Sequence, residues 1–282
     1  MKVERAHPAE HIPVLDGRRP IFILVLGSDA RSRDPQAVAQ NRADSIHVVG
    51  LNPARKQATI LGFPRDSWVG IPGNGNGRIN DAMVLGGPQL MVQTIEQLTG
   101  LHMDYYALTS FEGFKDLVDD LGGIRVDIPY EMKDEFSKTD FREGWEVLNG
   151  FDALAFTRDR HDVPNGDFSR SENQGVFLLS ALTQFHRQAS KDPTTILTWM
   201  AAGLRNIQTD LPFNDLVKLA FTASKLPTKE VTNLVVPGSI ASINGASIVK
   251  LSSDAERLYD DMRKDGVIAA PDRDKHLKNA GD

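Results

Sequence analysis

Arginine and carboxylate side chains gather in one short stretch of this chain, FTRDRHDVPNGDFSRSENQ, at residues 156–174. A guanidinium group presents a planar fork of donors that matches phosphate oxygens, so this composition suits a site for a doubly negative group. A solvated loop would have the same composition, and both interpretations stay open at this point. The residues of the stretch that would serve such a site are Arg158, Arg160, Asp167, Arg170 and Gln174.

Two aspartates, Asp29 and Asp44, stand where one predicted strand ends and where the next begins. If these strands are neighbours in a sheet, both carboxylates lie at one edge of it, where α/β sheets bind ligands. Mg²⁺ takes few protein oxygens together with water and substrate phosphates, so this pair could hold Mg²⁺ or, alternatively, Mn²⁺. The alternative is structural, with Asp29 capping a turn and Asp44 ending a strand.

Two further arginines follow strand-like segments. Arg65 comes directly after Pro64 with Asp66 beside it, and Arg78 ends the glycine- and asparagine-rich segment 71–78. Arg65 and Asp66 could instead form an exposed ion pair, which is worth at most about 1 kcal/mol. The segment 71–78 is not a nucleotide-binding P-loop because it lacks the Gly-Lys-Ser/Thr ending, and the alternative for it is a flexible loop.

Together these segments supply what a pyrophosphate site needs. Arginine outnumbers lysine between Ile21 and Gln174, whereas lysine is commoner from Gly175 onward. Several arginines and a metal would be needed to offset the desolvation of a pyrophosphate. Phosphoryl transfer itself depends mainly on positioning and on charge stabilisation.

Other kinds of site are disfavoured. The chain has no cysteine, so thiolate nucleophiles and thiolate metal sites are excluded. A net charge of −6 and a pI near 5.7 argue against nucleic acid as a partner. The seven histidines, His161 among them, show no metal-ligand spacing, and we interpret them as structural or surface residues.

Strand-like and helix-like patterns alternate along the first half of the chain. Apolar runs predict strands at 20–29, 45–53, 56–66, 104–110 and 124–129, and helical spacing predicts helices at 87–100 and 111–123. Later segments predict helices at 168–190, 193–205, 212–226 and 253–264, a strand at 232–238 and a hairpin at 239–251. The last helix would begin with a capping box formed by Ser253 and Glu256. This order favours an α/β fold, an α-β-α sandwich with a central mixed sheet flanked by helices.

Both ends of the chain are polar. Residues 1–20 lack the apolar core of a signal peptide, and no stretch approaches the roughly 18 apolar residues of a membrane-spanning helix. We expect a flexible N-terminal segment at 1–20, one folded catalytic domain at 21–265 and a polar tail at 266–282.

A series of motifs resembles the LytR-CpsA-Psr (LCP) phosphotransferases of bacterial cell envelopes. The matching segments are LVLGSDAR, NRADSI, LNPARKQATILGFPRDSWVGIPG, the long segment 78–129 from RINDAM to RVDIP, LNGFDALAFTRDRH and GDFSRSENQ, in the family's order from Ile21 to about Gly238. The resemblance implies a domain at the outer face of the cytoplasmic membrane, held by an N-terminal anchor that this chain lacks. It also implies transfer of a phospho-glycopolymer from a polyprenyl-pyrophosphate carrier to a peptidoglycan hydroxyl, assisted by Mg²⁺.

The resemblance also assigns roles to residues. Asp29 and Asp44 would hold the metal, and Asp29 could also remove a proton. Six arginines would contact the pyrophosphate, namely Arg42, Arg65, Arg78, Arg158, Arg160 and Arg170. Asp167 and Gln174 would support them. Of these, Arg65, Arg158 and Arg160 would be catalytic together with Asp29. The chain departs from the family by having Asn173 where many members carry arginine, and Arg78 where lysine is common.

An apolar groove for the lipid would come from the helices predicted at 86–98 and 111–121, unless their apolar residues belong to the ordinary core. Two other functions share the same site. One is hydrolysis of a prenyl pyrophosphate, and the other is a non-catalytic lipid carrier or regulator. The glycopolymer could be teichoic acid, capsule or arabinogalactan.

Overall fold

A mixed six-stranded sheet forms the centre of the molecule. The computed structural model describes residues 19–161 and 163–269. The sheet has the order β11-β6-β1-β2-β3-β12, in which β1 is antiparallel to β2 and parallel to β6, and β3 is parallel to β12. Its strands are β1 (Ile21–Ser28), β2 (Ala43–Asn52), β3 (Gln57–Gly62), β6 (Tyr105–Ser110), β11 (Gln208–Thr209) and β12 (Val231–Val235).

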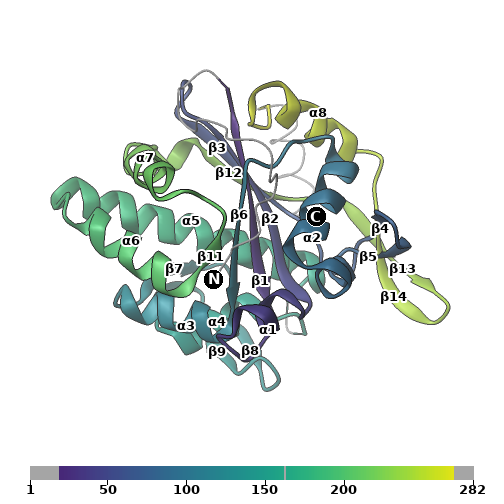
Figure 1. Cartoon of the computed structure of the whole chain (residues 1–282). Coiled ribbons are helices and arrows are strands. Elements are labelled where there is room, and N and C mark those ends of the chain that lie inside the picture. Colours follow the sequence, from purple (N-terminus) through teal and green to yellow (C-terminus); the bar gives the residue numbers. More distant parts are fainter. Residues whose placement is uncertain (1–18, 162, 270–282) are drawn as a thin grey trace.

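Helices cover both faces of this sheet, so the predicted α-β-α sandwich is confirmed (Figure 1). One layer holds α2 (Asp81–Thr99) and α8 (Ala255–Asp265), to the right of the sheet in Figure 1. The other layer, to the left, holds α5 (Asp167–Lys191), α6 (Thr195–Asn206) and α7 (Phe213–Ala223). The remaining helices are α1 (Pro35–Ala39), α3 (Phe111–Asp120), α4 (Gly150–Arg158) and the short η1 (Thr228–Glu230).

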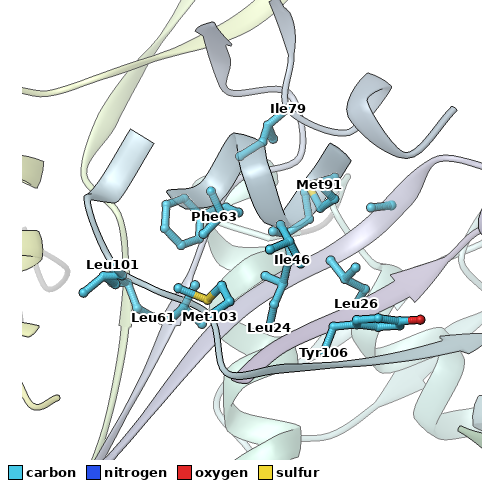
Figure 2. Packing of buried hydrophobic residues seen from close by; sticks show 14 of the residues in the cluster. Leu24, Leu26, Ile46, Leu61, Phe63, Ile79, Met91, Leu101, Met103 and Tyr106 are labelled. Atoms are coloured by element: carbon cyan, nitrogen blue, oxygen red, sulfur yellow. The ribbon is translucent and has the colours of Figure 1, made fainter. Parts of the chain in front are cut away.

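The continuous apolar character of β1 follows from burial on both faces. Leu24 and Leu26 point into the larger core with Ile46 of β2, and Figure 2 shows this group packed with Met91 of α2. Ile23 belongs to the opposite core, beneath α5. A strand buried on one face only would alternate apolar and polar residues, so the pattern of β1 already indicated two helical layers.

Helix α5 lies very close to the sheet because glycines allow the approach. A Cβ atom at Gly175 would stand 1.9 Å from Oδ1 of Asn233 in β12, and one at Gly62 would stand 2.5 Å from Oγ of Ser171. His47 of β2 is fully buried at the same contact, with Nε2 3.1 Å from the carbonyl oxygen of Ser171. This close packing holds the N-terminal turns of α5 against the ends of β2 and β3.

Four short strand pairs surround the sandwich, and the sequence analysis found only one of them in full. The predicted hairpin at 239–251 is confirmed as β13 (Gly238–Ile243) and β14 (Ala246–Leu251). The strands β4 (Trp68–Ile71) and β5 (Gly75–Arg78) lie beside it. The other two pairs join β7 (Ile124–Ile128) to β10 (Gly144–Leu148), and β8 (Met132–Asp134) to β9 (Thr139–Phe141). The three-residue strands β8 and β9 are too short to produce a period-two pattern.

Three local expectations were wrong. Helix α2 begins at Asp81 and is kinked at Gly86 and Gly87, because Gly87 has a φ of 66° and Pro88 follows. The capping box at Ser253 does not form, since the residue before α8 is Asp254 and Glu256 pairs with Arg263. Ile268 is buried and donates its N–H to Thr59 Oγ1 at 3.1 Å, so the first residues of the predicted tail belong to the domain.

Residues 1–18 of the expected flexible segment lie outside the described residues. Arg19, which was included in it, pairs with Asp104 at 2.6 Å. From residue 270 onward the expected tail also lies outside the described residues. Within residues 19–161 and 163–269, no helix has both the length and the apolar character needed to cross a membrane.

The burial of His47 makes the stability of the folded protein sensitive to acid. Loss of solvation lowers the pKa of this imidazole from 6.5 to about 4. The unfolded chain therefore binds a proton between these two pH values while the folded chain does not, and the free energy of unfolding falls as the pH is lowered through this window. We expect wild type to lose about 2.5 kcal/mol more than His47→Gln between pH 7.5 and pH 4.5, measured by urea unfolding. Equal losses in the two proteins would contradict this origin.

Candidate active site

The segments singled out in the sequence meet at one edge of the central sheet. Strand β1 ends where the antiparallel β2 begins, with Ser28 opposite Ala43, and the N–H of Asp29 donates to the carbonyl of Arg42 at 3.0 Å. Asp44 is the second residue of β2, and Arg65 follows the end of β3 at the same edge. The end of α4 and the beginning of α5 complete the assembly.

Four of the predicted arginines line one polar cavity of about 120 Å³. They come from three separate parts of the chain, after β3, at the end of α4 and in the first turn of α5. The remaining walls come from β2, from the β8–β9 hairpin and from the residue after Arg160. The full lining is Asp44, Arg65, Asp134, Phe136, Ser137, Arg158, Arg160, His161 and Arg170.

Two of these arginines, one half-buried and one buried, pair with carboxylates. Arg65 donates to Asp44, and Arg170, which is 4% exposed, donates to Asp167 one helical turn earlier. Burial is the largest influence on Arg170 and lowers its pKa, against the opposing charge of Asp167. Guanidinium groups nevertheless stay protonated in proteins, so the cavity keeps a high density of positive charge.

Some polar atoms around the cavity are buried without a hydrogen-bond partner. They include Nε of Arg65, Oδ1 of Asp29 and Oδ2 of Asp167. An unsatisfied buried donor or acceptor costs about 1–3 kcal/mol, so folded proteins seldom retain several in one region without a reason. A donor and two acceptors of this kind fit a site that receives a charged ligand.

The donor set at Asp29 and Asp44 fits a hard divalent cation. Burial, and then the negative charge of Asp44, raises the pKa of the Asp29 carboxyl against the opposing effect of Arg42. A cation between the two carboxylates would relieve this repulsion. Within the described part of the chain no group of three or more His, Cys, Asp or Glu could bind a metal alone. Mg²⁺ suits such a two-carboxylate site because it retains water and takes phosphate oxygens from the substrate.

An apolar pocket of about 290 Å³ joins the arginine cavity, since Asp44 and Arg158 line both. Phe111, Phe114 and Leu117 of α3 form part of its wall, and Phe177 and Leu178 of α5 form another part. The guanidinium of Arg158 lies 4.6 Å from the ring centre of Phe111, at the boundary between the charged and apolar spaces. The two spaces together suit an amphiphile with an anionic head.

Only one of the two segments predicted for the lipid groove lies at this pocket. The segment 111–121 lines the pocket, whereas the segment 86–98 does not. Met91, Val92 and Ile95 of α2 pack in the core on the other face of the sheet. Helical periodicity identified the buried stripe of α2, but the stripe does not reveal which face of the sheet it covers.

Two of the predicted arginines lie outside the lining of the cavity, as do the predicted supporting residues Asp167 and Gln174. Arg42 is more than half exposed and pairs with Asp81 at 3.3 Å. Arg78 donates to the carbonyl of Ser247 at 2.8 Å and lies 3.7 Å from Asp66. The structure therefore brings together Arg65, Arg158, Arg160 and Arg170, but leaves Arg42 and Arg78 bound to other groups.

Gln174 links three elements at the back of the cavity. Its side-chain amide donates to the carbonyl of Asp44 at 3.1 Å and to that of Thr157 at 3.0 Å. It therefore supports β2 and the end of α4. Asn173, which replaces the arginine common in the family, is buried and donates to the hydroxyl of Tyr130 at 3.1 Å.

The sequence analysis missed the wall formed by the β8–β9 hairpin. Asp134, Phe136 and Ser137 line the cavity, as does His161, which had been interpreted as a structural or surface residue. His161 contacts Asp134 through Nδ1 at 3.1 Å across 27 residues of sequence. No local pattern joins these positions, so only the folded chain reveals the contact.

Comparisons with known proteins identify the family. The LytR_cpsA_psr family model matches residues 2–264, and the chain belongs to the LytR-CpsA-Psr family. Polyisoprenyl-teichoic acid–peptidoglycan teichoic acid transferase TagU of Bacillus licheniformis is 31% identical over 241 residues, which cover 82% of this chain and 72% of that protein. TagV of Bacillus subtilis, which has the same descriptive name, is 28% identical over 249 residues, which cover 86% of this chain and 62% of that protein.

The fold is also that of solved relatives. The structure of TagT bound to LI-WTA superimposes with a TM-score of 0.73 at 25% identity, and covers 93% of this chain and 95% of that one. The chain spans less than two thirds of the length of TagV, although it spans nearly all of the solved TagT chain.

The buried pair of Arg170 and Asp167 gives a test of how charge is held at this site. Asp167→Asn leaves a buried guanidinium without its counter-charge, so we expect the free energy of unfolding to fall by about 3 kcal/mol. The matched control is Glu112→Gln, which removes the partly exposed partner of Lys115 and should cost less than about 1 kcal/mol. Chemical denaturation measures both, and equal effects would show that Arg170 is solvated.

Proposed function

We propose that this protein transfers a phospho-glycopolymer from a polyprenyl-pyrophosphate carrier to a hydroxyl of peptidoglycan. The single observation that carries this proposal is the union of an arginine-lined cavity with an apolar pocket through Asp44 and Arg158. A lipid pyrophosphate likewise has an anionic diphosphate joined directly to an apolar chain. The names of TagU and TagV support a polyisoprenyl-linked glycopolymer as donor and peptidoglycan as acceptor.

The arginines bind the diphosphate and stabilise the charge of the transition state. The acceptor oxygen attacks the phosphorus that carries the glycan, and the bond from that phosphorus to the bridging oxygen breaks. Prenyl phosphate leaves with the bonding electron pair. One charge pair about 4 Å apart is worth roughly 4 kcal/mol at an intermediate dielectric constant. Arg65 and Arg170, already paired with carboxylates, need little reorganisation to receive the anion.

Asp29 and Asp44 would hold Mg²⁺ or Mn²⁺, which would supply further positive charge to the phosphate oxygens when bound. Asp44 also pairs with Arg65, so it would couple the position of that guanidinium to the metal. Gln174 keeps the backbone of Asp44 fixed. Phe111 and its neighbours in α3 exclude water from the lipid chain.

The proposal sets the domain at the outer face of the cytoplasmic membrane, where lipid-linked polymers and peptidoglycan meet. The polymer class nearest to the named relatives is teichoic acid.

Arg65→Ala tests the catalytic assignment. We expect the rate of prenyl phosphate release from a lipid-linked donor with Mg²⁺ to fall by about 10²–10³-fold, because a donor to the reacting phosphate is lost. The control Arg55→Ala removes a more exposed arginine that also pairs with an aspartate, Asp265, away from the cavity, and should leave the rate unchanged. An unchanged rate in Arg65→Ala would remove this residue from the site.

Product analysis separates the alternatives. Transfer predicts a peptidoglycan fragment that carries the polymer and prenyl phosphate in equal amounts. Release of prenyl phosphate that is indifferent to the acceptor would identify a hydrolase. Tight binding of the donor without turnover, under conditions in which a known family member is active, would identify a carrier or regulator.

A further inference from the structure

The β8–β9 hairpin fixes an ionised carboxylate at the wall of the arginine cavity. Oδ2 of Asp134 accepts hydrogen bonds from Oγ of Ser137 at 2.7 Å and from its N–H at 3.1 Å, while Oδ1 accepts one from the N–H of Phe136 at 3.0 Å. Burial acts to raise the pKa of Asp134, but the hydrogen bonds from Ser137, Phe136 and His161 outweigh it and hold the pKa well below its usual range. The group is therefore an acceptor only.

This carboxylate determines which nitrogen of His161 carries a proton. Nδ1 of His161 lies 3.1 Å from Oδ2 of Asp134 and must donate to it, because an ionised carboxylate cannot donate. In the neutral imidazole, Nε2 is then left with a lone pair and can accept a proton. Asp134 thus selects the tautomer of His161 in the way that an aspartate orients a catalytic histidine in hydrolases.

The ring of His161 is held in place without being buried. The ring of Phe136 packs at 5.1 Å from it, and the N–H of His161 donates to Oδ1 of Asp159 at 3.3 Å. The side chain is still 50% exposed and lines the same cavity as the four arginines. A histidine of the protein core would instead be enclosed, as His47 is. An oriented, accessible imidazole beside a phosphate site suits proton transfer.

We propose that His161 is the general base of the transfer reaction and that Asp134 is its positioning residue. This inference depends on the function proposed above. As the acceptor oxygen bonds to phosphorus, its proton passes to Nε2 of His161, and prenyl phosphate departs with the electrons of the broken bond. The resulting imidazolium is stabilised by Asp134 and later loses the proton to solvent. Asp29 remains available to hold the metal.

The charges around His161 come from every side of the cavity. Asp134 belongs to the hairpin, Asp159 and Arg160 come from the segment after α4, and Arg158 ends that helix. Asp44, Arg65 and Arg170 form the remaining charged walls. Four arginines and three aspartates therefore surround this imidazole.

His161→Gln tests the base directly. We expect kcat for transfer to a peptidoglycan fragment to fall by about 10²–10³-fold, within the range that general bases contribute, while the Kd of the lipid-linked donor stays unchanged. The decrease of kcat at low pH should also disappear in this variant. Asp134→Asn should lower kcat by a smaller factor and change the pH at which kcat decreases on the acid side. His102→Gln is the matched control, because this exposed histidine also lies near a carboxylate, Glu96, but not in the cavity.

A second variant distinguishes chemistry from structure. In His161→Ala, added imidazole should restore at least about a tenth of the wild-type rate, because it can replace the missing base. A wild-type kcat and pH profile in His161→Gln would overturn the assignment of the base alone, as would failure of imidazole to raise the rate of His161→Ala. A wild-type protein without turnover would overturn the proposed function, and the base with it.

Discussion

The burial of positive charge at one edge of the sheet is the constraint on which the rest of this structure depends. Arg65 and Arg170 cannot lose water unless carboxylates stand beside them, and Asp44 and Asp167 meet that need. With Arg158 and Arg160 on the same cavity, positive charge still exceeds the negative charge of its lining. The remaining excess is what favours a doubly negative ligand over water, and it exists before any ligand arrives.

The sandwich supports this edge from both sides. Helix α5 carries Arg170 and Gln174, and it can approach β2 and β12 only because Gly62 and Gly175 leave room for it. The opposite layer, with α2 and α8, completes the core beneath β1 and β2 without reaching the cavity (Figures 1 and 2). The edge is therefore rigid where the charges are held. The apolar pocket extends between α3 and α5, where the lipid chain of the proposed donor would be shielded from water.

The hairpin β8–β9 adds a different kind of wall. Its loop contributes a carboxylate, a hydroxyl and an exposed ring to a cavity that is otherwise basic. Electrostatic stabilisation and proton transfer make different demands, since the first needs fixed charge and the second needs an accessible lone pair. The arginines meet the first demand, and His161, which directly follows Arg160 and is held by Asp134 of β8, meets the second in the same small space.

The sequence by itself determined the helices and the main strands, because an apolar period of 3.6 residues and a continuous apolar run are local properties. It also determined the α/β class, the family, and the presence of Arg65, Arg158, Arg160 and Arg170 in segments bordering apolar elements. Its prediction for the pocket failed in α2, whose apolar stripe was correct but whose layer was not.

Only the tertiary structure decided which charged residues share a cavity. Arg42 and Arg78 have the same chemistry as the other arginines, yet pairing with Asp81 and Ser247 directs them elsewhere. The contact between Asp134 and His161 joins a three-residue strand to a loop 27 residues away. Periodicity carries no information about contacts across such separations, because they depend on the packing of whole layers rather than on the spacing of neighbours along the chain.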